Sequence, residues 1–543
     1  MADYDLVELA RRPAVFTPAI LAVAYVLYRL FLQPSRLPDL PVLNARKGEW
    51  FSYWRAMWRN TKDFKAACVL ARTQYRDQPC IVPVLGVRPM ILLPAKNTKF
   101  VIDNPEHVLS LHESAMDNLQ SDYTMGERLI REPVHHPLIV TTLTNQTGNL
   151  IPELAEETEH SLDELWGSDT AEWREVCVYT SLQRSIGRVT NRIFVGKPVC
   201  RDPELLRQGI AFAIDVPLGS QLLRLFPEFV RPLAAAVLMI PNRLHQRAFF
   251  KVLRPTIEQR LREYDERHRD PEKNKALGPE PNDFLQWLVN QAKEMGDPYH
   301  MKPSTLALRV QVLNFASIHT SSFAITGAVL DLVASRPGVM DELRDEIRTV
   351  LAAHGGKWNK RALAQMEKLD STFRESQRVN SFVTMGLGRR VVARDGVTTP
   401  EGLHIPRGNQ VCVPGYAMHH DPEIYEAPDE FHPFRFSDMR KQPAENGDAA
   451  AAAGDKEAAQ ASYLSRARKQ WATTTTDFLG FGHGRGACPG RFFAAAELKL
   501  MLAHLILHYD FEMLDKRPRN MWFALNRVPP MEQTIRVKRR AAA

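Results

Sequence analysis

Two stretches of the chain are apolar over lengths greater than those of an ordinary amphipathic helix. Residues 13–32 are apolar except at Thr17 and Arg29, which is about the length needed to cross a bilayer. Residues 303–334 predict one long helix, which ends before Pro337. Because the apolar residues of this second stretch lie on every side and polar residues interrupt it, we expect a helix buried in the protein rather than in a membrane.

The remaining pattern is mostly helical with short β-like pieces. Residues 50–300 have helical periodicity, interrupted by the β-like segments 80–85 and 90–94. Residues 389–396 predict a strand followed by a turn, and residues 491–507 predict a helix. No internal repeat accompanies these elements.

The apolar run near the N-terminus has two interpretations. Ala22-Val-Ala24 suits the cleavage site of a signal peptide, but it lies inside the run, so we expect an uncleaved anchor over residues 1–33. Two basic residues precede the run (Arg11 and Arg12) and three follow it (Arg36, Arg46 and Lys47), which favours a body that faces the cytosol. Prolines then predict a stiff hinge over residues 34–49, ahead of a main domain over residues 50–543.

Composition narrows the class of protein without deciding its function. The 543 residues carry a net charge of +7, which suits a membrane surface or an acidic protein partner. We expect no nucleic acid partner, because no dense basic stripe with interleaved aromatic residues occurs. Six scattered cysteines argue against a disulfide framework or a zinc site. Residues 444–460 predict an exposed low-complexity insertion.

The candidate chemistry lies in a glycine-rich loop with a single cysteine. The segment reads Phe481-Gly-His-Gly-Arg485-Gly-Ala-Cys488-Pro-Gly490, and the predicted helix at 491–507 follows it. A helix N-terminus favours a thiolate, so we expect a lowered pKa for this cysteine. Zinc and iron–sulfur sites require several cysteines or histidines at close spacing, so a lone thiolate beside glycine backbone points to haem iron.

Two other interpretations of this loop compete. Gly480-Phe-Gly482 begins a dinucleotide-binding fingerprint, but the segment at 471–479 is mostly polar and no βαβ series surrounds it. A buried structural cysteine is the usual fate of a lone cysteine, and the loop alone leaves that interpretation open.

The loop resembles the haem-binding loop of cytochrome P450 enzymes, in the form Phe-Gly-x-Gly-Arg-x-x-Cys-Pro-Gly found among fungal members. The resemblance implies that Cys488 is the axial ligand of the haem iron. It also implies that the cofactor is bound by Phe481, Gly482, Arg485 and Gly490.

Two features depart from the family pattern. Gly486 stands where relatives carry a histidine or arginine that contacts a haem propionate, and the Trp-x-x-x-Arg usual near residues 125–150 is missing. His135 and His136 occupy that region, where we expect surface or packing histidines. Residues 191–201 nevertheless resemble a segment of the fungal branch.

The long helix carries a second match. Ala316-Ser-Ile-His319-Thr320 matches the oxygen-activation motif of the family at Ala316 and Thr320, with His319 in place of an acid that relays protons. Neighbours on a helix diverge by about 100°. We therefore predict that Thr320 carries the oxygen chemistry and that His319, the other catalytic candidate, is mainly structural. A polar patch between packed helices is the alternative interpretation.

Two further segments follow in family order. Glu375-Ser-Gln-Arg378 matches the Glu-x-x-Arg motif, and Arg435 matches the second arginine, which together imply a buried Arg–Glu–Arg network that holds the cysteine loop. By itself the pair is typical of a solvated helix surface. Arg390 matches an arginine that binds a haem propionate in relatives, although a solvent-facing strand arginine explains it almost as well.

The resemblance spans the chain and implies a mainly α fold with a smaller β-rich part, preceded by one N-terminal transmembrane helix. It implies a monooxygenase with haem b, which receives electrons from NADPH through NADPH–cytochrome P450 reductase. The expected substrate is a small apolar fungal secondary metabolite, such as a terpenoid, polyketide or alkaloid. We expect a monomer in the endoplasmic reticulum, anchored by a single span with its catalytic domain facing the cytosol.

Two other functions stay open at this point. A haem-thiolate isomerase or dehydratase would need no O₂, and the altered residues beside Thr320 agree with it. A non-catalytic haem-binding protein would explain Gly486 and the missing Trp-x-x-x-Arg.

Overall fold

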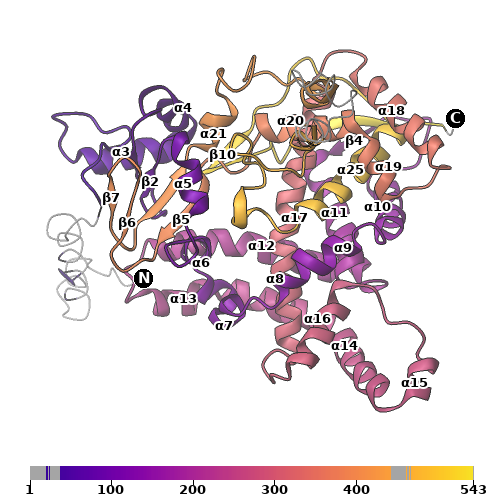
Figure 1. Cartoon of the computed structure of the whole chain (residues 1–543). Coiled ribbons are helices and arrows are strands. Elements are labelled where there is room, and N and C mark those ends of the chain that lie inside the picture. Colours follow the sequence, from indigo (N-terminus) through magenta and orange to yellow (C-terminus); the bar gives the residue numbers. More distant parts are fainter. Residues whose placement is uncertain are drawn as a thin grey trace, which may run out of the picture.

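The computed structural model describes residues 37–441 and 466–541, together with the isolated positions 17, 20, 21, 24, 460 and 464. Within these residues the protein is mainly helical with four small β-sheets (Figure 1), which confirms the predicted fold class. The predicted anchor over residues 1–33 and the predicted insertion over residues 444–460 lie outside the described residues, apart from those isolated positions.

The described α-helices are α3 (Ser52–Lys62), α4 (Phe64–Gln74), α5 (Thr98–Asp103), α6 (Leu111–Leu119), α7 (Glu127–Arg131), α8 (His135–Leu138), α9 (Thr144–Gln146), α10 (Ile151–Trp166), α11 (Val178–Phe194), α12 (Pro203–Arg224), α13 (Arg231–Leu238), α14 (Ile240–Arg269), α15 (Pro271–Ala276), α16 (Phe284–Met295), α17 (Pro303–Val333), α18 (Val339–Ala353), α19 (Lys360–Gln365), α20 (Glu367–Val379), α21 (Gly415–His419), α22 (Arg435–Lys441) and α25 (Arg491–His508).

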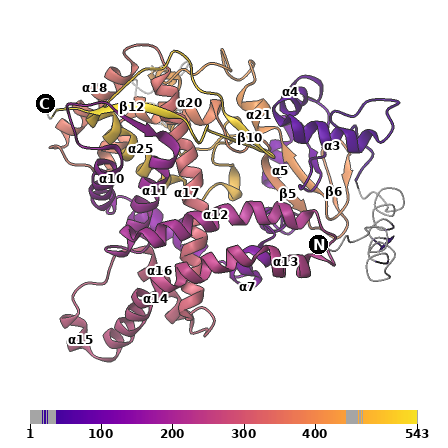
Figure 2. The same ribbon diagram turned by 180° about the vertical axis from the view of Figure 1, so that it is seen from behind.

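Helix α17 is the long helix predicted from the sequence, and α11, α12, α14, α20 and α25 pack against it. Figure 2 shows α12 crossing α17. Among the described helices, α17 is the one long and apolar enough to cross a membrane, but 67% of its apolar window is buried inside the structure. This burial is what we expect of a core helix.

The largest sheet has five strands in the order β1-β2-β8-β5-β3. Its members are β1 (Cys80–Val82), β2 (Met90–Leu92), β3 (Leu109–Ser110), β5 (Gly386–Val391) and β8 (Gln410–Val413). β2 and β8 are parallel, and the other neighbours are antiparallel. Helices α5 and α6 pack against β5, so this sheet brings the strand with Arg389 and Arg390 beside the helical part.

Three smaller sheets complete the fold. β4 (Arg174–Cys177), β12 (Thr534–Arg539) and β9 (Tyr509–Phe511) form an antiparallel sheet that brings the C-terminal strand beside residues 174–177. β10 (Met521–Phe523) pairs with β11 (Asn526–Val528), and β6 (Val397–Thr398) pairs with β7 (His404–Ile405).

The main hydrophobic core lies between helices that precede the cysteine loop in the sequence and the helix that follows it. It contains buried residues of α10, α11, α17, α18, α20 and α25. Trp471, which is fully buried, stacks on Phe373 of α20 with ring centroids 4.3 Å apart. Phe481 of the loop packs beside Trp471 at 5.5 Å. Aromatic pairs of this kind add about 0.5–1.5 kcal/mol each beyond the area they bury, so the core fixes where the loop begins.

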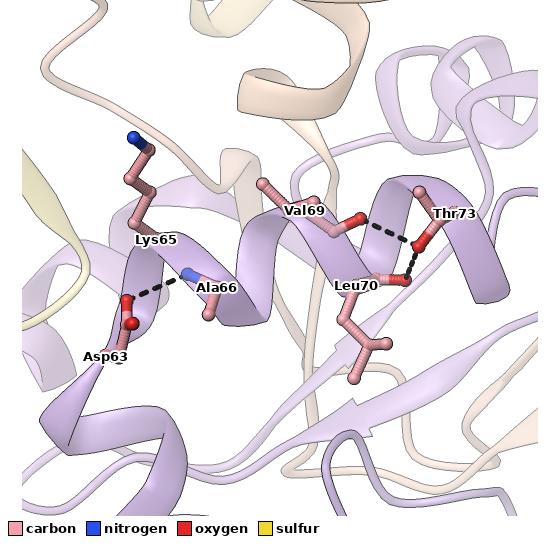
Figure 3. A pocket seen from close by; sticks show the side chains of 6 residues that line it. All are labelled: Asp63, Lys65, Ala66, Val69, Leu70 and Thr73. Atoms are coloured by element: carbon pink, nitrogen blue, oxygen red, sulfur yellow. Dashed lines mark hydrogen bonds between the residues drawn. The ribbon is translucent and has the colours of Figure 1, made fainter.

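A shallow hollow of about 350 Å³ lies along α4. Figure 3 shows its lining residues, Asp63, Lys65, Ala66, Val69, Leu70 and Thr73, all of which belong to α4 or its N-cap. Since the residues predicted for the site lie on α17, α20, β5 and the cysteine loop, this hollow is separate from the candidate site.

Candidate functional site

The cysteine loop is a compact turn closed by its own backbone. The N–H of Gly482 donates to the Leu479 carbonyl at 2.9 Å, and the N–H of Cys488 donates to the Phe481 carbonyl at 2.8 Å. Gly482 and Gly484 both have φ of +68°, a conformation that favours glycine. A Cβ on Gly484 would also lie 2.2 Å from Ile102 Cγ2 of α5. The glycines therefore permit both the turn and its close packing.

Cys488 is the one exposed cysteine of the six. Helix α25 begins three residues later, with Gly490 as its N-cap. Atoms packed around the sulfur raise the pKa of the Cys488 thiol, and the backbone N–H groups of Gly490 and Arg491 oppose that shift. The lowered pKa predicted from the sequence is wrong in direction, because the protein atoms packed near the sulfur outweigh the helix N-terminus although the residue as a whole is exposed. The donors at the start of α25 still face the sulfur, and metal coordination itself favours the thiolate.

The remaining loop residues have different surroundings. Phe481 packs beside Trp471, whereas Arg485 is exposed on the 3₁₀ turn η6 (Gly484–Gly486). A Cβ on Gly490 would meet no atom within 4 Å. These placements leave the predicted cofactor roles of Phe481, Gly482, Arg485 and Gly490 as predictions.

Helix α20 supports the loop through a residue that the sequence analysis missed. Gln377 Nε2 donates to the Gly480 carbonyl at 2.9 Å, and Gln377 Oε1 accepts from Trp471 Nε1 at 2.6 Å. Gln377 occupies one of the two variable positions between Glu375 and Arg378, so the motif itself gave no signal for it. Its side-chain amide therefore joins Gly480, the first glycine of the loop, to Trp471, which precedes the loop.

The predicted ion-pair network is formed by three side chains with little or no exposure. Glu375 Oε1 accepts from Arg378 Nη2 at 2.8 Å and from Arg435 Nε at 2.9 Å. The side chains of Glu375 and Arg378 are 0% exposed and that of Arg435 is 10% exposed. The alternative of a solvated surface pair is therefore wrong, because solvent does not reach the carboxylate.

The network reaches the cysteine loop through His419 of α21. Arg378 Nη1 donates to the His419 carbonyl at 2.6 Å, and His419 Nε2 accepts the N–H of Leu479 at 3.0 Å. Burial lowers the pKa of His419 to about 3, which keeps the ring neutral and able to accept. A continuous chain of hydrogen bonds thus joins Glu375 to the residue that precedes the glycine loop.

Helix α17 presents two small residues on an otherwise buried surface. Ala316 and Thr320 are exposed and lie four residues apart, on one face of the helix. The hydroxyl of Thr320 donates to the Ala316 carbonyl at 2.8 Å. Because its proton is used within the helix, the oxygen lone pairs of Thr320 point outward and are able to accept a proton donor.

His319 is turned away toward α11. Its Nδ1 lies 2.9 Å from the Tyr179 hydroxyl and 3.1 Å from Gln183 Nε2, and the amide nitrogen of Gln183 can only donate. Nδ1 is therefore an acceptor, and Nε2 carries the proton. Burial lowers the pKa of His319, partly offset by the carbonyl of Ile210. The ring bridges helices, as expected of a structural residue.

The arginine of β5 that lies beside the cysteine loop is not Arg390, the one predicted from the sequence to bind a propionate. Successive strand residues point to opposite faces, and the one beside the cysteine loop is Arg389, because a Cβ on Gly486 would lie 2.5 Å from Arg389 Nη2. Arg390 lies on the other face of β5. Burial raises the pKa of Asp117 there, but ion pairs to Arg88 and Arg224 and, more weakly, the charge of Arg390 hold that pKa below its usual value.

Arg389 also has the charge and the burial expected of a residue that binds an anion. Its side chain is buried, and its guanidinium donates to the Gly388 carbonyl at 2.9 Å. Within the described part of the chain no carboxylate lies within ion-pair distance of it, and burial lowers its pKa, with only the more distant charge of Glu106 opposing. A buried cation of this kind calls for an anionic ligand group.

Other candidates from the sequence analysis are structural. His135 Nδ1 accepts from the buried Arg309 Nη1 at 3.1 Å, and burial lowers the pKa of His135 to about 3. His136 is exposed. The sequence also suggests Phe382, Val383 and Met385 as wall residues of a substrate pocket, or equally as core residues. Met385 belongs to a buried core cluster, whereas Val383 is 41% exposed and the rings of Phe382 and Phe323 of α17 have centroids 5.3 Å apart.

Taken together, the donor set fits a haem. The one exposed thiol faces the N–H groups at a helix start, glycines precede and follow it in the loop, and a buried guanidinium lies beside the loop. Helix α17, which carries Ala316 and Thr320, packs against α25, the helix that follows the loop (Figure 1). The thiol matches an iron ligand, and the guanidinium matches a propionate.

Comparison with known proteins agrees with this geometry. The sequence model of the family described as Cytochrome P450 matches residues 115–534. Cytochrome P450 monooxygenase gloP of Glarea lozoyensis is 30% identical over 536 residues, which cover 96% of this chain and 95% of that protein. Cytochrome P450 monooxygenase 71 of Postia placenta is 34% identical over 435 residues, covering 79% and 80%. Cytochrome P450 monooxygenase astC of Aspergillus terreus is 29% identical over 539 residues, covering 97% of each chain.

A solved structure shares the fold. The retinoic acid-bound cyanobacterial CYP120A1 superposes with a TM-score of 0.62 at 18% identity, covering 92% of this chain and 99% of that one. At this identity the likeness concerns the arrangement of helices and sheets alone.

Proposed function

Because the chain belongs to the cytochrome P450 family and its relatives are monooxygenases, which are oxidoreductases, we propose that it inserts one oxygen atom of O₂ into a small apolar organic substrate. The observation that carries this proposal is the placement of Cys488 at the start of α25, beside the helix that exposes Ala316 and Thr320. The resemblance to fungal members suggests a secondary metabolite as substrate, for example a terpenoid, polyketide or alkaloid.

The chain's own residues would bind the cofactor and hold a proton donor in place. When bound, the haem supplies a thiolate-ligated iron that activates O₂. Cys488 provides the sulfur ligand, and the N–H groups of Gly490 and Arg491 stabilise its charge. Arg389 offers a guanidinium to a propionate. Thr320 presents lone pairs on the exposed face of α17, where it would hold a proton donor in place.

The electron donor and the location form the second part of the proposal. Electrons come from NADPH through NADPH–cytochrome P450 reductase, and the protein is a monomer held in the endoplasmic reticulum by one span, with its body in the cytosol. The apolar run at residues 13–32 and the proline-rich segment after it support this location. Deletion of residues 1–33 should shift the protein toward the soluble fraction while haem binding persists. Loss of haem on this deletion would argue that the segment belongs to the fold.

Two measurements test the activity. Cys488→Ala should abolish the carbon monoxide difference spectrum of the haem-thiolate, because no other cysteine lies in a comparable loop; an unchanged spectrum would refute the assignment. Purified protein with reductase, incubated with metabolites extracted from a strain lacking the gene, should form a product only when NADPH and O₂ are both present. Product formation without O₂ would instead favour an isomerase or dehydratase.

A further inference from the structure

Arg374 is a buried cation on α20, directly before Glu375. The carboxylates of α20 nearest to it in sequence, those of Asp370 and Glu375, pair with other residues. Within the described residues no carboxylate lies at ion-pair distance from Arg374. Burial lowers the pKa of Arg374 to about 10, which leaves the guanidinium charged at neutral pH. Because an unpaired buried charge is unfavourable, neighbouring groups have to compensate for it.

Backbone carbonyls and aromatic rings take the place of the missing counter-charge. Arg374 Nη1 donates to the carbonyls of Gln470 at 2.5 Å and Thr473 at 2.8 Å. Its Cζ lies 3.9 Å from the ring centroid of Phe478 and 4.7 Å from that of Phe436 on α22. The negative face of an aromatic ring attracts a cation, and the attraction is stronger where water is excluded.

Apart from the contact with Phe436, these contacts fall on the segment that leads into the cysteine loop. Residues 471–479 form neither helix nor strand, so no regular ladder of backbone hydrogen bonds fixes their path. Arg374 contacts Gln470 at the start of this segment and Phe478 near its end, two residues before Gly480. A single side chain therefore holds both ends of the segment.

The Glu375 network contacts a different part of the chain. Arg378 and Arg435 donate to backbone carbonyls between residues 419 and 430. Arg374 donates to the carbonyls of residues 470 and 473, which lie closer to the cysteine along the chain. The contacts of Arg374 are thus additional to those of the network.

Phe478 also connects Arg374 to His419. The rings of Phe478 and His419 stack with centroids 5.5 Å apart, and His419 Nε2 accepts the N–H of Leu479 at 3.0 Å. Only a neutral ring can accept this bond. Burial is the main cause that lowers the pKa of His419 to about 3, and the charge of Arg374 is among those that add to the shift.

We propose that Arg374 is a positioning residue for the sulfur ligand. By holding both ends of residues 470–478, its guanidinium sets the position of the loop that carries Cys488. A lysine cannot replace it, because an ammonium group lacks the planar fork that donates to carbonyls while it lies on a ring. This inference rests on the proposed role of Cys488 as the axial ligand of the haem iron.

Arg309 of α17 provides a matched control. Its side chain is also fully buried, no carboxylate of the described residues lies at ion-pair distance from it, and burial lowers its pKa to about 10. Its guanidinium donates to the carbonyls of Leu129 at 3.3 Å and Glu132 at 3.1 Å. Arg309→Met therefore removes a buried guanidinium of the same kind that serves the end of α7 instead of the cysteine loop.

The test compares Arg374→Met, Arg374→Lys and Arg309→Met in the full-length, haem-loaded protein. The carbon monoxide difference spectrum, divided by total haem, gives the share of haem with thiolate ligation. Both Arg374 variants should lose about half of this share or more, and should transfer haem to apomyoglobin roughly fivefold faster than the wild type. Arg309→Met should keep the wild-type share in the folded protein that it yields.

Phe478→Leu keeps the test decisive if Arg374→Met does not accumulate. This variant removes the ring and leaves the hydrogen bonds of Arg374 in place, so it should speed haem transfer by a smaller factor. Combined with Arg374→Lys, its effect should be less than the product of the two single effects, because both act on one contact.

The outcomes separate this inference from the proposed function. A wild-type thiolate share in Arg374→Lys and Phe478→Leu overturns the inference, and so does an equal loss in Arg309→Met, which would show a general effect on folding. A wild-type protein without the thiolate spectrum refutes the role of Cys488 instead.

Discussion

The guanidinium of Arg389 lies against the α-carbon of Gly486, so that a Cβ at position 486 would come within 2.5 Å of Arg389 Nη2 and 2.9 Å of Leu111 Cδ2. The two residues share one space, and strand β5 supplies a cation where the loop lacks a side chain. This arrangement explains how the loop can keep a propionate partner without the histidine or arginine of its relatives.

The first prediction concerns this pair. Arg389→Ala should speed haem loss roughly tenfold or more, because a hydrogen bond to a charged group contributes about 1.5–3 kcal/mol. Gly486→Ala should act in the same direction by displacing the guanidinium, and the double variant should be little worse than either single one. The measurement is the rate of haem transfer to apomyoglobin.

Controls for this prediction lie on the same strand. Gly388→Ala places its Cβ at an ordinary 3.6 Å from Ser114 Oγ and should leave the rate unchanged. Arg390→Ala, on the other face of β5, should also have little effect. If Arg390→Ala speeds haem loss and Arg389→Ala does not, Arg390 binds the propionate, as the sequence predicts, and the role inferred for Arg389 from the geometry is wrong.

The second prediction concerns the buried network. Glu375→Ala leaves Arg378 at 0% exposure without its counter-charge, a penalty of roughly 3–5 kcal/mol. We expect little haem-loaded protein, measured as yield from the carbon monoxide spectrum. Glu204→Ala is the matched control, because Glu204 and Arg207 have the same i,i+3 spacing but are 40% and 70% exposed; its yield should equal that of the wild type. Equal yields for both variants would contradict the role of the network.

The sequence identified the elements of the site better than their detailed contacts. Local patterns placed the helices at 303–334 and 491–507 within one residue, because each has clear start and stop residues and long apolar runs. The family motif also predicted that Glu375 contacts Arg435, which lies 60 residues later in the chain. The motif predicts this contact because one buried carboxylate pairs with both arginines.

Contacts between elements were harder to predict. Arg389 and Arg390 are adjacent on β5, and the register of β5 in its sheet decides which of them contacts the loop. The sequence alone does not reveal that register. The direction of the Cys488 pKa shift was predicted wrongly for a related reason. The number of atoms packed near the sulfur depends on the tertiary fold, which the local sequence does not reveal. Gln377 had no signal because any residue fits between the two charged positions of its motif.

A third prediction concerns stability and pH. Glu497 of α25 is 1% exposed, accepts the Thr190 hydroxyl at 2.7 Å, and burial raises its pKa to about 8. Between the usual pKa of a glutamate and about 8, the folded protein keeps a proton that the unfolded protein has lost. Stability contributed by this group is therefore present at low pH and is lost as pH rises through that window, by about 1.4 kcal/mol per pH unit.

Glu497→Gln tests this, because an amide cannot lose the proton. We expect the apparent melting temperature of the variant to rise relative to that of the wild type from about pH 6 to about pH 8, with both measured at one scan rate. At any one pH, the difference in melting temperature between the two proteins also includes the cost of fitting the new NH₂ group. Only the change of this difference with pH is therefore diagnostic. Parallel curves across this range would show that Glu497 is ionised in the folded protein.

The last prediction separates the two neighbours on α17. Thr320 is exposed with its oxygen lone pairs outward, whereas the ring of His319 accepts from Tyr179 and Gln183 on α11 and is kept neutral by burial. Thr320→Ala should therefore consume NADPH and release hydrogen peroxide with little product. His319→Gln should keep most of the coupling between NADPH use and product, and Tyr179→Phe should behave like it, because both act on the bridge between helices.

The pH profile adds a readout that a purely structural role would not move. Since the pKa of His319 lies below its ordinary value of 6.5, the ring stays neutral above that pH and the coupling of the wild type should be flat from about pH 6.5 to about pH 8. His319→Gln should show the same flat profile with a lower melting temperature. If instead the His319 variant uncouples as severely as Thr320→Ala and removes a pH dependence present in the wild type, the imidazole is the proton relay. Its contact with Tyr179 would then have to open during turnover, because the observed geometry turns Nδ1 toward α11.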